Sequence, residues 1–453
     1  MRDVILPKKL CEAVTSTGIS GKALQKGIDF IQYLLYKYST DEQELERTNF
    51  INIPSQTLKS FFDRDYNTLF MSIFTQNKIV IRSPFKSGSA DGNQCFGYRL
   101  NDELMDFNET DIINLPASKT KDKSVDDIDY VINDLRKIEF DIPAMLDYVK
   151  NINVANLIKL NKQITEDPIE LTPIFSKIKF KTNKPLKDAL TLATKFRKDL
   201  VEYDNRFFIV RSATFCKWKN IALKSALIYS INKLKNQDFY AGRNETNFRM
   251  DTNLTNLKGD FFKNGYLRLD GELIVDIDLK NSQPTLLSFV LSGGIFKHQH
   301  FQPIVSGYTF PEIDRTQIDY QLFIQLAESG LLYDHIGTMM GWSRDHAKQN
   351  FIKTMFADAR WAGSNKMKLK LLFPTVLSWM DQFKMKNNND LAVLLQRIES
   401  RIFIDDIYMK LRAKGFLVYT KHDSILCKQS DQPTIMDEMC IILDTYGFKY
   451  RLE

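Results

Sequence analysis

Hydrophobic and polar residues alternate along the first hundred residues in a way that predicts three helices. Residues 19–39, 53–62 and 66–80 carry apolar side chains at helical spacing. Pro54 followed by Ser55 is typical of a helix start, and this supports the second of the three. The N-terminal part of the chain is therefore expected to begin as a small helical domain.

Two strand-like segments, KIVIRSPF and QCFGYRL, follow these helices. The intervening KSGSADGN has the Gly, Ser, Asp and Asn residues of a hairpin tip. Three helices and a hairpin are the element order of a winged helix-turn-helix domain, which we predict for residues 1–100. Arg82 and Lys86 would then lie on the wing, where they could contact nucleic-acid phosphates. The alternative is a domain that only packs against the rest of the chain or against a protein partner.

The next 140 residues change in composition twice. Residues 101–128 are charged and poor in aromatic residues, which predicts a solvated linker. Residues 129–240 have a mainly helical pattern, and from residue 177 onward lysines and arginines alternate with aromatic residues. Such a mixture suits a surface that follows a nucleic-acid backbone, although amphipathic helices with lysines on the solvated face have the same composition.

A strand followed by a buried helix is predicted over residues 271–292, GELIVDIDLKNSQPTLLSFVLS. LIVDIDL has β-branched residues and a period of two, so Asp276 and Asp278 share one face of the strand. NSQP then supplies an N-cap and an early proline for the apolar helix that follows.

A second apolar segment with an isolated acid is FLVYTKHDSILCKQS, residues 416–430. Asp423 stands at its centre between two apolar runs. A lone acid on a strand is usually an edge or capping residue, but two such strands indicate a shared metal site. Burying Asp278 and Asp423 is costly unless a cation neutralises them. Mg²⁺ does so readily, because one or two carboxylates hold it together with substrate phosphates.

The segment between these strands, WSRDHAKQNFIKTMFADARW, predicts a helix with a distinctive face. Arg344, Lys348, Ile352 and Phe356 recur every four residues and therefore lie near one face. On its own this would be an ordinary amphipathic stripe. Between two metal-binding strands, the face would present positive charge to a triphosphate and an apolar side chain to a base.

Composition and charge limit the setting in which this chemistry occurs. The 453 residues suffice for two or three domains, and 62 Lys and Arg against 56 Asp and Glu give a net charge of +6, which permits a polyanionic partner without requiring one. No apolar stretch approaches the ~20 residues of a membrane span, and the first residues do not resemble a signal peptide. Five scattered cysteines fit a reducing compartment, so we expect a cytoplasmic protein with no membrane partner.

The order of these three segments resembles motifs A, B and C of the family A DNA polymerases and single-subunit phage-type RNA polymerases. The resemblance implies that Asp278 is the metal ligand of motif A, with Asp276 as the rival register, and that Gln283 is the sugar-sensing position five residues later. Arg344, Lys348, Ile352 and Phe356 match the fingers motif without a gap, with Phe where the family has Tyr.

Motif C has the form HDS here, which is typical of the phage-type RNA polymerases, whereas family A DNA polymerases usually have HDE. The resemblance implies that Asp423 is the second metal carboxylate and that His422 faces the primer end. FRMDTNLTNL resembles the segment before motif A, at a shorter spacing than usual, and would put Arg249 near the primer-template or the nucleotide. LLQRIESRIFIDDI resembles the helix before motif C, whose Gln396 would touch template or primer.

These resemblances together imply an α+β polymerase right hand. Residues 241–453 would form the palm and fingers, residues 129–240 a helical thumb-like region, and the winged helix would precede both. The NSQP form of motif A resembles a set of phage and mobile-element proteins. We expect two-metal nucleotidyl transfer with two Mg²⁺ ions, Mn²⁺ being an alternative, and with Lys348 and Arg344 balancing the triphosphate charge.

The motifs favour RNA or primer synthesis on a DNA template. The Gln283 amide could bond a 2′ hydroxyl, and HDS points the same way, whereas Phe356 lacks the hydroxyl that helps the RNA polymerases to select ribose. One alternative is a DNA polymerase for phage or plasmid replication, and another is an inactive palm that binds nucleic acid as a replication factor. Expected partners are a DNA template, or RNA, nucleoside triphosphates, and a helicase or other replication proteins.

Overall fold

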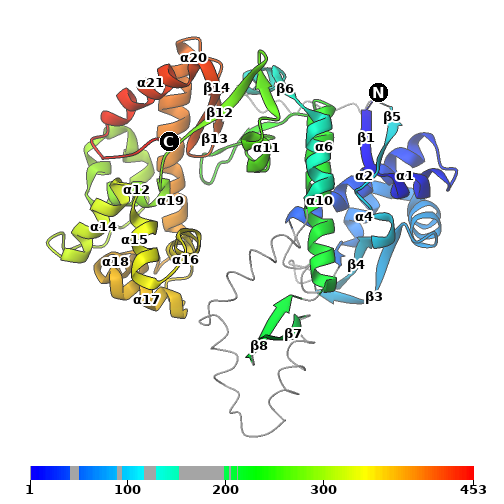
Figure 1. The fold of residues 1–453 in the computed structure, drawn as a ribbon, viewed down its shortest axis with the longest axis horizontal. Coiled ribbons are helices and arrows are strands. Elements are labelled where there is room, and N and C mark those ends of the chain that lie inside the picture. Colours follow the sequence, from blue (N-terminus) through cyan, green and yellow to red (C-terminus); the bar gives the residue numbers. More distant parts are fainter. Residues whose placement is uncertain are drawn as a thin grey trace, which may run out of the picture. The chain divides into compact units, whose positions relative to one another are not determined.

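The computed structural model describes residues 2–40, 50–88, 94–116, 129–152, 198–203, 206–211 and 213–453. Over these residues the chain is a mixed α+β structure, and the α+β class predicted from the sequence is confirmed at that level (Figure 1). The chain divides into two compact units. The first comprises Met1–Asp122 and Asp141–Asp238, and the second comprises Lys123–Phe140 and Phe239–Glu453.

The first unit begins with a strand that makes hydrogen bonds along both of its edges. Strand β1 (Arg2–Pro7) pairs antiparallel with β5 (Thr110–Leu115). Asn232 on helix α10 (Ala213–Lys235) accepts from the Ile5 N–H at 2.7 Å and donates to the Ile5 carbonyl at 2.9 Å. Residues 110–115, which the sequence predicted as linker, therefore form a strand instead, because β1 pairs with them.

The helices and hairpin predicted for the first hundred residues are present. They are α2 (Gly21–Thr40), α4 (Ser55–Phe62), the π-helix η2 (Tyr66–Thr75), β3 (Val80–Gly88) and β4 (Gln94–Leu100), preceded by α1 (Lys8–Thr15). A short strand, β2 (Ile51–Asn52), makes the hairpin a three-stranded sheet of order β2-β4-β3. The assignment of these elements to a winged helix stays a prediction.

Aromatic side chains form the core of this helical part. Phe30, Phe62 and Phe70 pack edge to face or tilted, with ring centroids 4.9 to 5.2 Å apart. Gly27 on α2 allows a close approach, because a Cβ there would lie 2.2 Å from the ring of Phe74. The apolar periodicity of the sequence thus corresponds to one buried cluster.

The region predicted as a thumb, residues 129–240, is divided between the two units. Helix α5 (Asp129–Leu135) and strand β6 (Ile138–Phe140) belong to the second unit, whereas α6 (Ile142–Asn151) and α10 belong to the first. Strands β7 (Lys198–Tyr203) and β8 (Arg206–Arg211) pair antiparallel, so the region is not wholly helical. The basic and aromatic segment was predicted between residues 177 and 243, and the side chains of residues 177–219 lie outside the described part of the chain.

The second unit is built on a five-stranded sheet of order β13-β14-β12-β11-β6, whose pairs are all antiparallel. The strands are β13 (Tyr419–Lys421), β14 (Ser424–Lys428), β12 (Glu272–Asp278), β11 (Leu267–Leu269) and β6. The strand predicted to carry two acids, β12, is central, and the HDS segment forms the neighbouring hairpin. Both acid-bearing segments therefore lie side by side.

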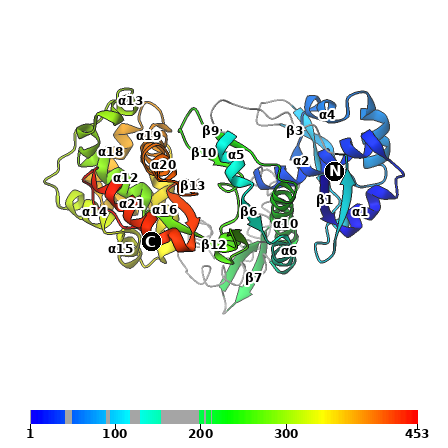
Figure 2. The same ribbon diagram turned by 90° about the horizontal axis from the view of Figure 1, so that it is seen from above.

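Helices make up most of the remaining second unit. Between β12 and β13 they are α12 (Ser282–Leu291), η4 (Gly294–Lys297), η5 (Gln299–Phe301), α13 (Gln302–Val305), α14 (Ile318–Glu328), α15 (Leu332–Met340), α16 (Arg344–Phe356), α17 (Ser364–Leu372), α18 (Pro374–Phe383), α19 (Asp390–Ser400), η6 (Arg401–Tyr408) and α20 (Met409–Ala413). Before β11 lie the hairpin β9 (Ala241–Arg243) and β10 (Met250–Thr252) and helix α11 (Gly259–Lys263); after β14 come η7 (Gln429–Asp431) and α21 (Gln432–Asp444). Helices α19, η6 and α20 follow one another, and η6 packs against β13 and β14 (Figure 2).

Candidate active site

Asp278 and Asp423 lie at the same end of two paired strands. Asp278 is the last residue of β12 and pairs with Ser424, the first residue of β14. The Leu279 N–H donates to the Asp423 carbonyl at 3.3 Å, which ties the end of β12 to the hairpin turn. The two carboxylate-bearing residues predicted as metal ligands are thus neighbours across the sheet.

The turn that presents Asp423 is tight and contains a strained residue. Lys421 and Ser424 pair with each other, so His422 and Asp423 alone form the turn. His422 has a φ of 58°, in the left-handed region that a residue with a Cβ adopts at a cost of about 1–3 kcal/mol. Burial, followed by the charge of Arg249, lowers the pKa of His422, and its Nδ1 is buried without a hydrogen-bond partner.

The electrostatic environment of Asp278 disfavours its charged form. Burial, and next the charges of Asp423 and Asp276, raise the pKa of Asp278 to about 7, and Lys348 on α16 acts in the opposite direction. Carboxylates that crowd one another in this way need a cation to be charged together.

Asp276 and Asp278, the two candidates that the sequence left open for the metal ligand of motif A, have different surroundings. Asp276 and Asp278 share a face of β12, but Asp276 pairs with Leu426, two residues further from the turn than Asp278. Lys421 Nζ lies 3.4 Å from Asp276 Oδ2. Asp276 therefore already has a cation beside it, whereas Asp278 stands next to Asp423.

Helix α16 leaves the four residues of the predicted face at least partly accessible. Lys348 is exposed, and Arg344, Ile352 and Phe356 are half-buried. The side of the helix that adjoins this face is fully buried, and it includes Ala347, Phe351 and Met355. Charge and apolar surface on one accessible face are what binding of a nucleoside triphosphate would require.

Both ends of α16 are fixed by side chains. Ser343 accepts from the His346 N–H at 3.2 Å as the N-cap. Lys384, which follows α18 and is fully buried, donates from Nζ to the carbonyls of Thr354 at 3.1 Å, Met355 at 2.9 Å and Ala357 at 2.9 Å. Burial lowers the pKa of Lys384 to about 8. A cation at the carboxyl end of a helix satisfies free carbonyls and opposes the helix dipole.

Two of the predicted residues, Arg249 and Gln283, bind the same buried carboxyl group. It belongs to Glu399, which was not predicted from the sequence. Glu399 on α19 is 1% exposed. Arg249 binds it with two donors, Nε to Oε1 at 2.9 Å and Nη2 to Oε2 at 3.0 Å. Gln283 Nε2 donates to Glu399 Oε2 at 2.5 Å. Burial and the charge of Asp423 raise the pKa of Glu399 to about 8, and Arg249 and Gln283 act against this rise.

The remaining predicted residues lie in different parts of the molecule. Gln396, one turn before Glu399, accepts from Asn247 Nδ2 at 3.2 Å. Arg82 belongs to the first unit, is exposed, and has its guanidinium 4.4 Å from the ring centroid of Phe96. Lys86 is on β3, paired with Phe96. Gln396 thus lies beside Glu399 on α19, whereas Arg82 and Lys86, which were predicted to lie on a wing, belong to the first unit.

Glu399 and Lys384 could have been found as charged residues on apolar helix faces. Glu399 lies four residues after Leu395, within an otherwise buried face of α19. Lys384 lies four residues after Met380 at the end of α18, on the buried side. A charge at a core position needs a partner, so each position signals a polar contact that the sequence alone does not identify.

The donor set is suited to Mg²⁺ held partly by a substrate. No group of three or more His, Cys, Asp or Glu side chains within the described ranges converges as a metal site. Asp278 and Asp423 are nevertheless adjacent, and burial and the neighbouring carboxylates raise the pKa of Asp278, so its charged form lacks sufficient compensation. Because Mg²⁺ is commonly held by one or two carboxylates with phosphates and water, these residues fit it.

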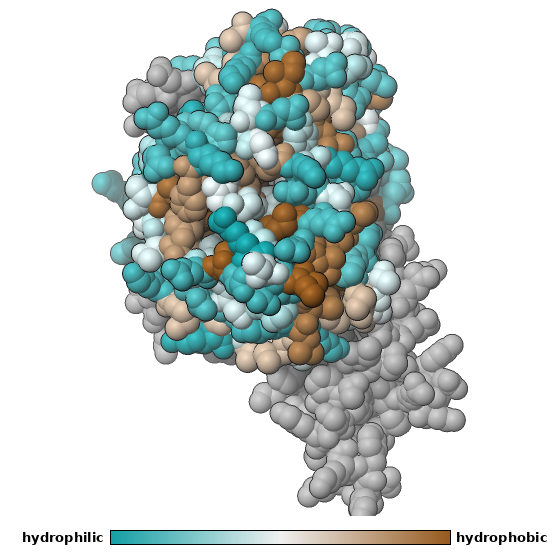
Figure 3. All heavy atoms as spheres, turned by 90° about the vertical axis from the view of Figure 1, so that its left-hand side faces the viewer, coloured by the Kyte–Doolittle hydropathy of each residue, from teal (hydrophilic) through white to brown (hydrophobic). Residues whose placement is uncertain are grey.

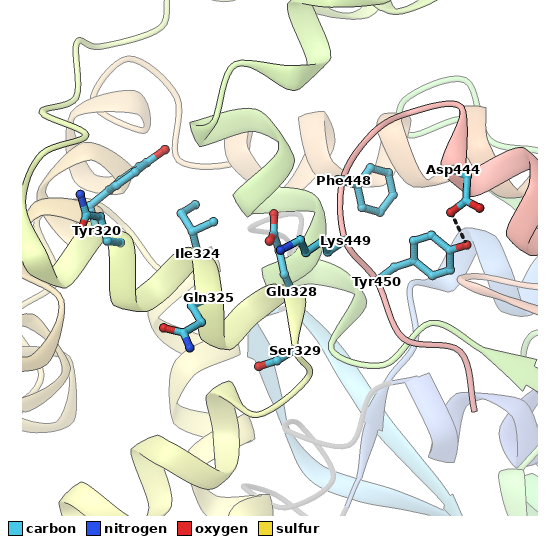
Figure 4. A pocket seen from close by; sticks show the side chains of 10 residues that line it. Tyr320, Ile324, Gln325, Glu328, Ser329, Asp444, Phe448, Lys449 and Tyr450 are labelled. Atoms are coloured by element: carbon cyan, nitrogen blue, oxygen red, sulfur yellow. Dashed lines mark hydrogen bonds between the residues drawn. The ribbon is translucent and has the colours of Figure 1, made fainter.

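A hollow of about 820 Å³ lies elsewhere in the second unit, between α14 and the segment that follows α21 (Figure 4). It is lined by Tyr320, Gln321, Ile324, Gln325, Glu328, Ser329, Asp444, Phe448, Lys449 and Tyr450. The Tyr450 hydroxyl donates to Asp444 Oδ1 at 2.8 Å, and burial raises the pKa of Glu328. The surface drawn in Figure 3 mixes apolar and hydrophilic side chains. None of the residues predicted for the site lines this hollow.

The chain was compared with protein families and with curated proteins. No protein-family model matches the chain, and no curated protein matches it. In the part of the chain that the structure describes, there is also no helix with both the length and the apolar character needed to cross a membrane.

Proposed function

We propose that the chain is a template-directed nucleotidyltransferase of the family A polymerase type. The 3′ hydroxyl of a growing strand attacks the α-phosphorus of a nucleoside triphosphate, the bond to the bridging oxygen breaks, and pyrophosphate and a proton are released. The single observation that carries the proposal is the adjacency of Asp278 and Asp423 at the end of β12 and its neighbouring hairpin, with the charge of Lys348 acting on Asp278.

The two carboxylates would hold the metal. When bound, Mg²⁺, or Mn²⁺ in its place, would neutralise phosphate charge and favour loss of the proton from the attacking 3′ hydroxyl. Asp278 and Asp423 themselves repel a triphosphate, so their role depends on a cation. Asp276 has Lys421 at 3.4 Å, and this favours Asp278 as the ligand.

Helix α16 would bind the nucleotide. Lys348 and Arg344 supply positive charge to the triphosphate, and that charge counts most as the leaving pyrophosphate develops. Ile352 and Phe356 are half-buried on the same face and offer apolar surface to the base. The bonds from Lys384 to the carboxyl end of α16 support this role, because they hold Phe356 and its neighbours in one position.

Nucleic acid would contact both units in this proposal. Arg249, Gln396 and His422 would face the primer-template, and the unpartnered Nδ1 of His422 is an atom that such a ligand could satisfy. The first unit would bind DNA as a winged helix, with Arg82 and Lys86 on phosphates. A polymerase right hand, with palm and fingers in residues 241–453, is the architecture that accommodates these roles.

The sugar site favours ribonucleotides, so RNA or primer synthesis on a DNA template is the preferred form of the activity. Gln283 is a neutral amide, and it is half-buried whereas every other residue of α12 is buried. A neutral amide can hydrogen-bond a 2′ hydroxyl without excluding it.

The test is incorporation by the purified full chain. Primed and unprimed DNA templates are incubated with Mg²⁺ and either ribo- or deoxyribonucleoside triphosphates, and labelled products are separated by length. We expect template-dependent products with ribonucleotides at least as readily as with deoxyribonucleotides. Products from deoxyribonucleotides alone would indicate a DNA polymerase. Template binding without products from any nucleotide would contradict the proposal and favour a replication factor without catalysis.

A further inference from the structure

The side-chain amide of Gln283 has a defined orientation, which follows from its partner. Its Nε2 lies 2.5 Å from Glu399 Oε2, and a carboxylate oxygen can only accept from it. Arg249 donates twice to the same carboxylate, so three N–H groups converge on Glu399. The Arg249 guanidinium and the Gln283 amide act against the burial that raises the pKa of Glu399, and in its ionised form this carboxylate can only accept. The Gln283 nitrogen therefore faces Glu399, and its oxygen faces away.

The opposite end of the amide is a buried acceptor without a partner. Gln283 Oε1 is buried and makes no hydrogen bond. Leaving a buried acceptor unsatisfied costs stability, and native proteins keep few such groups without a reason. Asn281 and Ser282, the two residues before Gln283, also have buried polar side-chain atoms without partners. Several buried polar atoms without hydrogen-bond partners therefore lie at the start of α12, a few residues after Asp278.

We propose that Glu399 is a positioning residue for sugar selection: together with Arg249 it turns the Gln283 amide so that Oε1 accepts from a ribose hydroxyl of the incoming nucleotide. This inference rests on the proposed function. A 2′ hydroxyl can donate to an acceptor, whereas a deoxyribose has no group there. Because neighbouring side chains cover Oε1, the hydroxyl reaches it only when the site rearranges around the substrate.

The fixed orientation explains how a glutamine can discriminate between sugars. A free amide can rotate by half a turn and offer either a donor or an acceptor. The bond to Glu399 removes this freedom and leaves only the acceptor. A carboxylate supplied by α19 thus acts on the sugar through a residue of α12, and these two helices pack against each other.

Glu399→Gln tests the inference in the full chain. The variant keeps the size of the side chain but can donate to Gln283, so the amide is no longer held in one orientation. The measurement is kcat/KM for ATP and for dATP on a primed DNA template with Mg²⁺. We expect the preference for ATP over dATP to fall about three- to tenfold, the usual effect of one hydrogen bond. Asp390→Asn, at the first position of α19, is the matched control and should leave the ratio unchanged.

A double-variant cycle separates positioning from a merely structural role. Gln283→Leu removes the acceptor and should lower the same ratio, and Glu399→Gln should have no further effect on the ratio in that background. A structural role would lower the melting temperature and both kcat/KM values without changing their ratio. An unchanged ratio in an active Glu399→Gln protein, or a ratio that falls additively in the double variant, would overturn the inference while the proposed function stands.

Failure of the proposed function has a different signature. A wild-type chain that neither incorporates nucleotides nor binds Mg²⁺-ATP or Mg²⁺-dATP by calorimetry would overturn the function and the inference together. A wild type that binds both nucleotides with equal affinity and incorporates both at equal rates would overturn only the inference. Binding that favours ATP, lost in Glu399→Gln, would support it.

Discussion

Replacing Asp278 by Asn should stabilise the metal-free protein at pH 8, although it removes a proposed catalytic residue. The substitution keeps the shape of the side chain and the backbone bonds between Asp278 and Glu453, at 2.9 and 3.0 Å. It removes a negative charge from a position where burial, Asp423 and Asp276 all oppose it. Active-site residues that cost stability in this way are expected where function requires their charge.

The pH dependence follows from the direction of the pKa shift. The pKa of Asp278 is raised from 3.8 to about 7, so between these values the folded protein holds a proton that the unfolded chain has lost. The free energy of unfolding therefore falls as pH rises through that window, and the cost is complete above pH 7. At about 1.4 kcal/mol per pKa unit the upper limit is ~4 kcal/mol, and relaxation of the partly solvated site reduces this to roughly 1–2 kcal/mol.

The assay is unfolding by urea or heat in buffer with chelator, at pH 5 and pH 8. At pH 8 we expect Asp278→Asn to unfold at a higher urea concentration or temperature than wild type. The difference should be smaller at pH 5, where wild-type Asp278 is largely protonated. Asp437→Asn, an exposed acid on α21, is the control and should change little at either pH. Adding Mg²⁺ should stabilise the wild type more than the variant. A variant that is less stable than wild type by the same amount at both pH values would refute the reasoning.

Three further substitutions test other parts of the site and the first unit. Lys348→Ala should raise KM for nucleoside triphosphates on the order of tenfold with template affinity unchanged; an equal effect of exposed Lys353→Ala in steady-state kinetics would contradict this. Lys384→Met should lower the free energy of unfolding by about 2 kcal/mol, because three α16 carbonyls lose their donor; an unchanged urea midpoint would count against the role given to this lysine. Arg82→Ala should reduce the slope of log binding constant against log salt by about one, if the first unit binds DNA. The same slope in both proteins would argue that Arg82 contacts no phosphate.

Elements set by local pattern could be predicted from the sequence. The period of two in LIVDIDL gave the strand β12, with Asp276 and Asp278 on one face. The four-residue spacing of the predicted fingers helix gave α16 and its accessible face, because side chains four apart on a helix are neighbours. In both cases the local spacing of apolar residues was sufficient to predict the element.

Pairing between distant segments could not be predicted. Strand β6, at residues 138–140, joins the sheet that carries Asp278, and β1 pairs with β5 across about a hundred residues. Neither pairing has a local signal, because strand partners are chosen by burial and by the whole topology. The same applies to the bond between Glu399 and Gln283, which joins residues 116 positions apart.

The most direct test of the central claim is single-nucleotide incorporation by wild type, Asp278→Asn and Asp423→Asn under identical conditions. Each protein is mixed with a primed template, Mg²⁺ and the nucleotide that the wild type uses best, and the rate of primer extension is followed alongside template binding. We expect extension to fall by at least a thousandfold in both variants while template affinity is retained. Extension at the wild-type rate by either variant would contradict the assignment of Asp278 and Asp423 as the catalytic carboxylates.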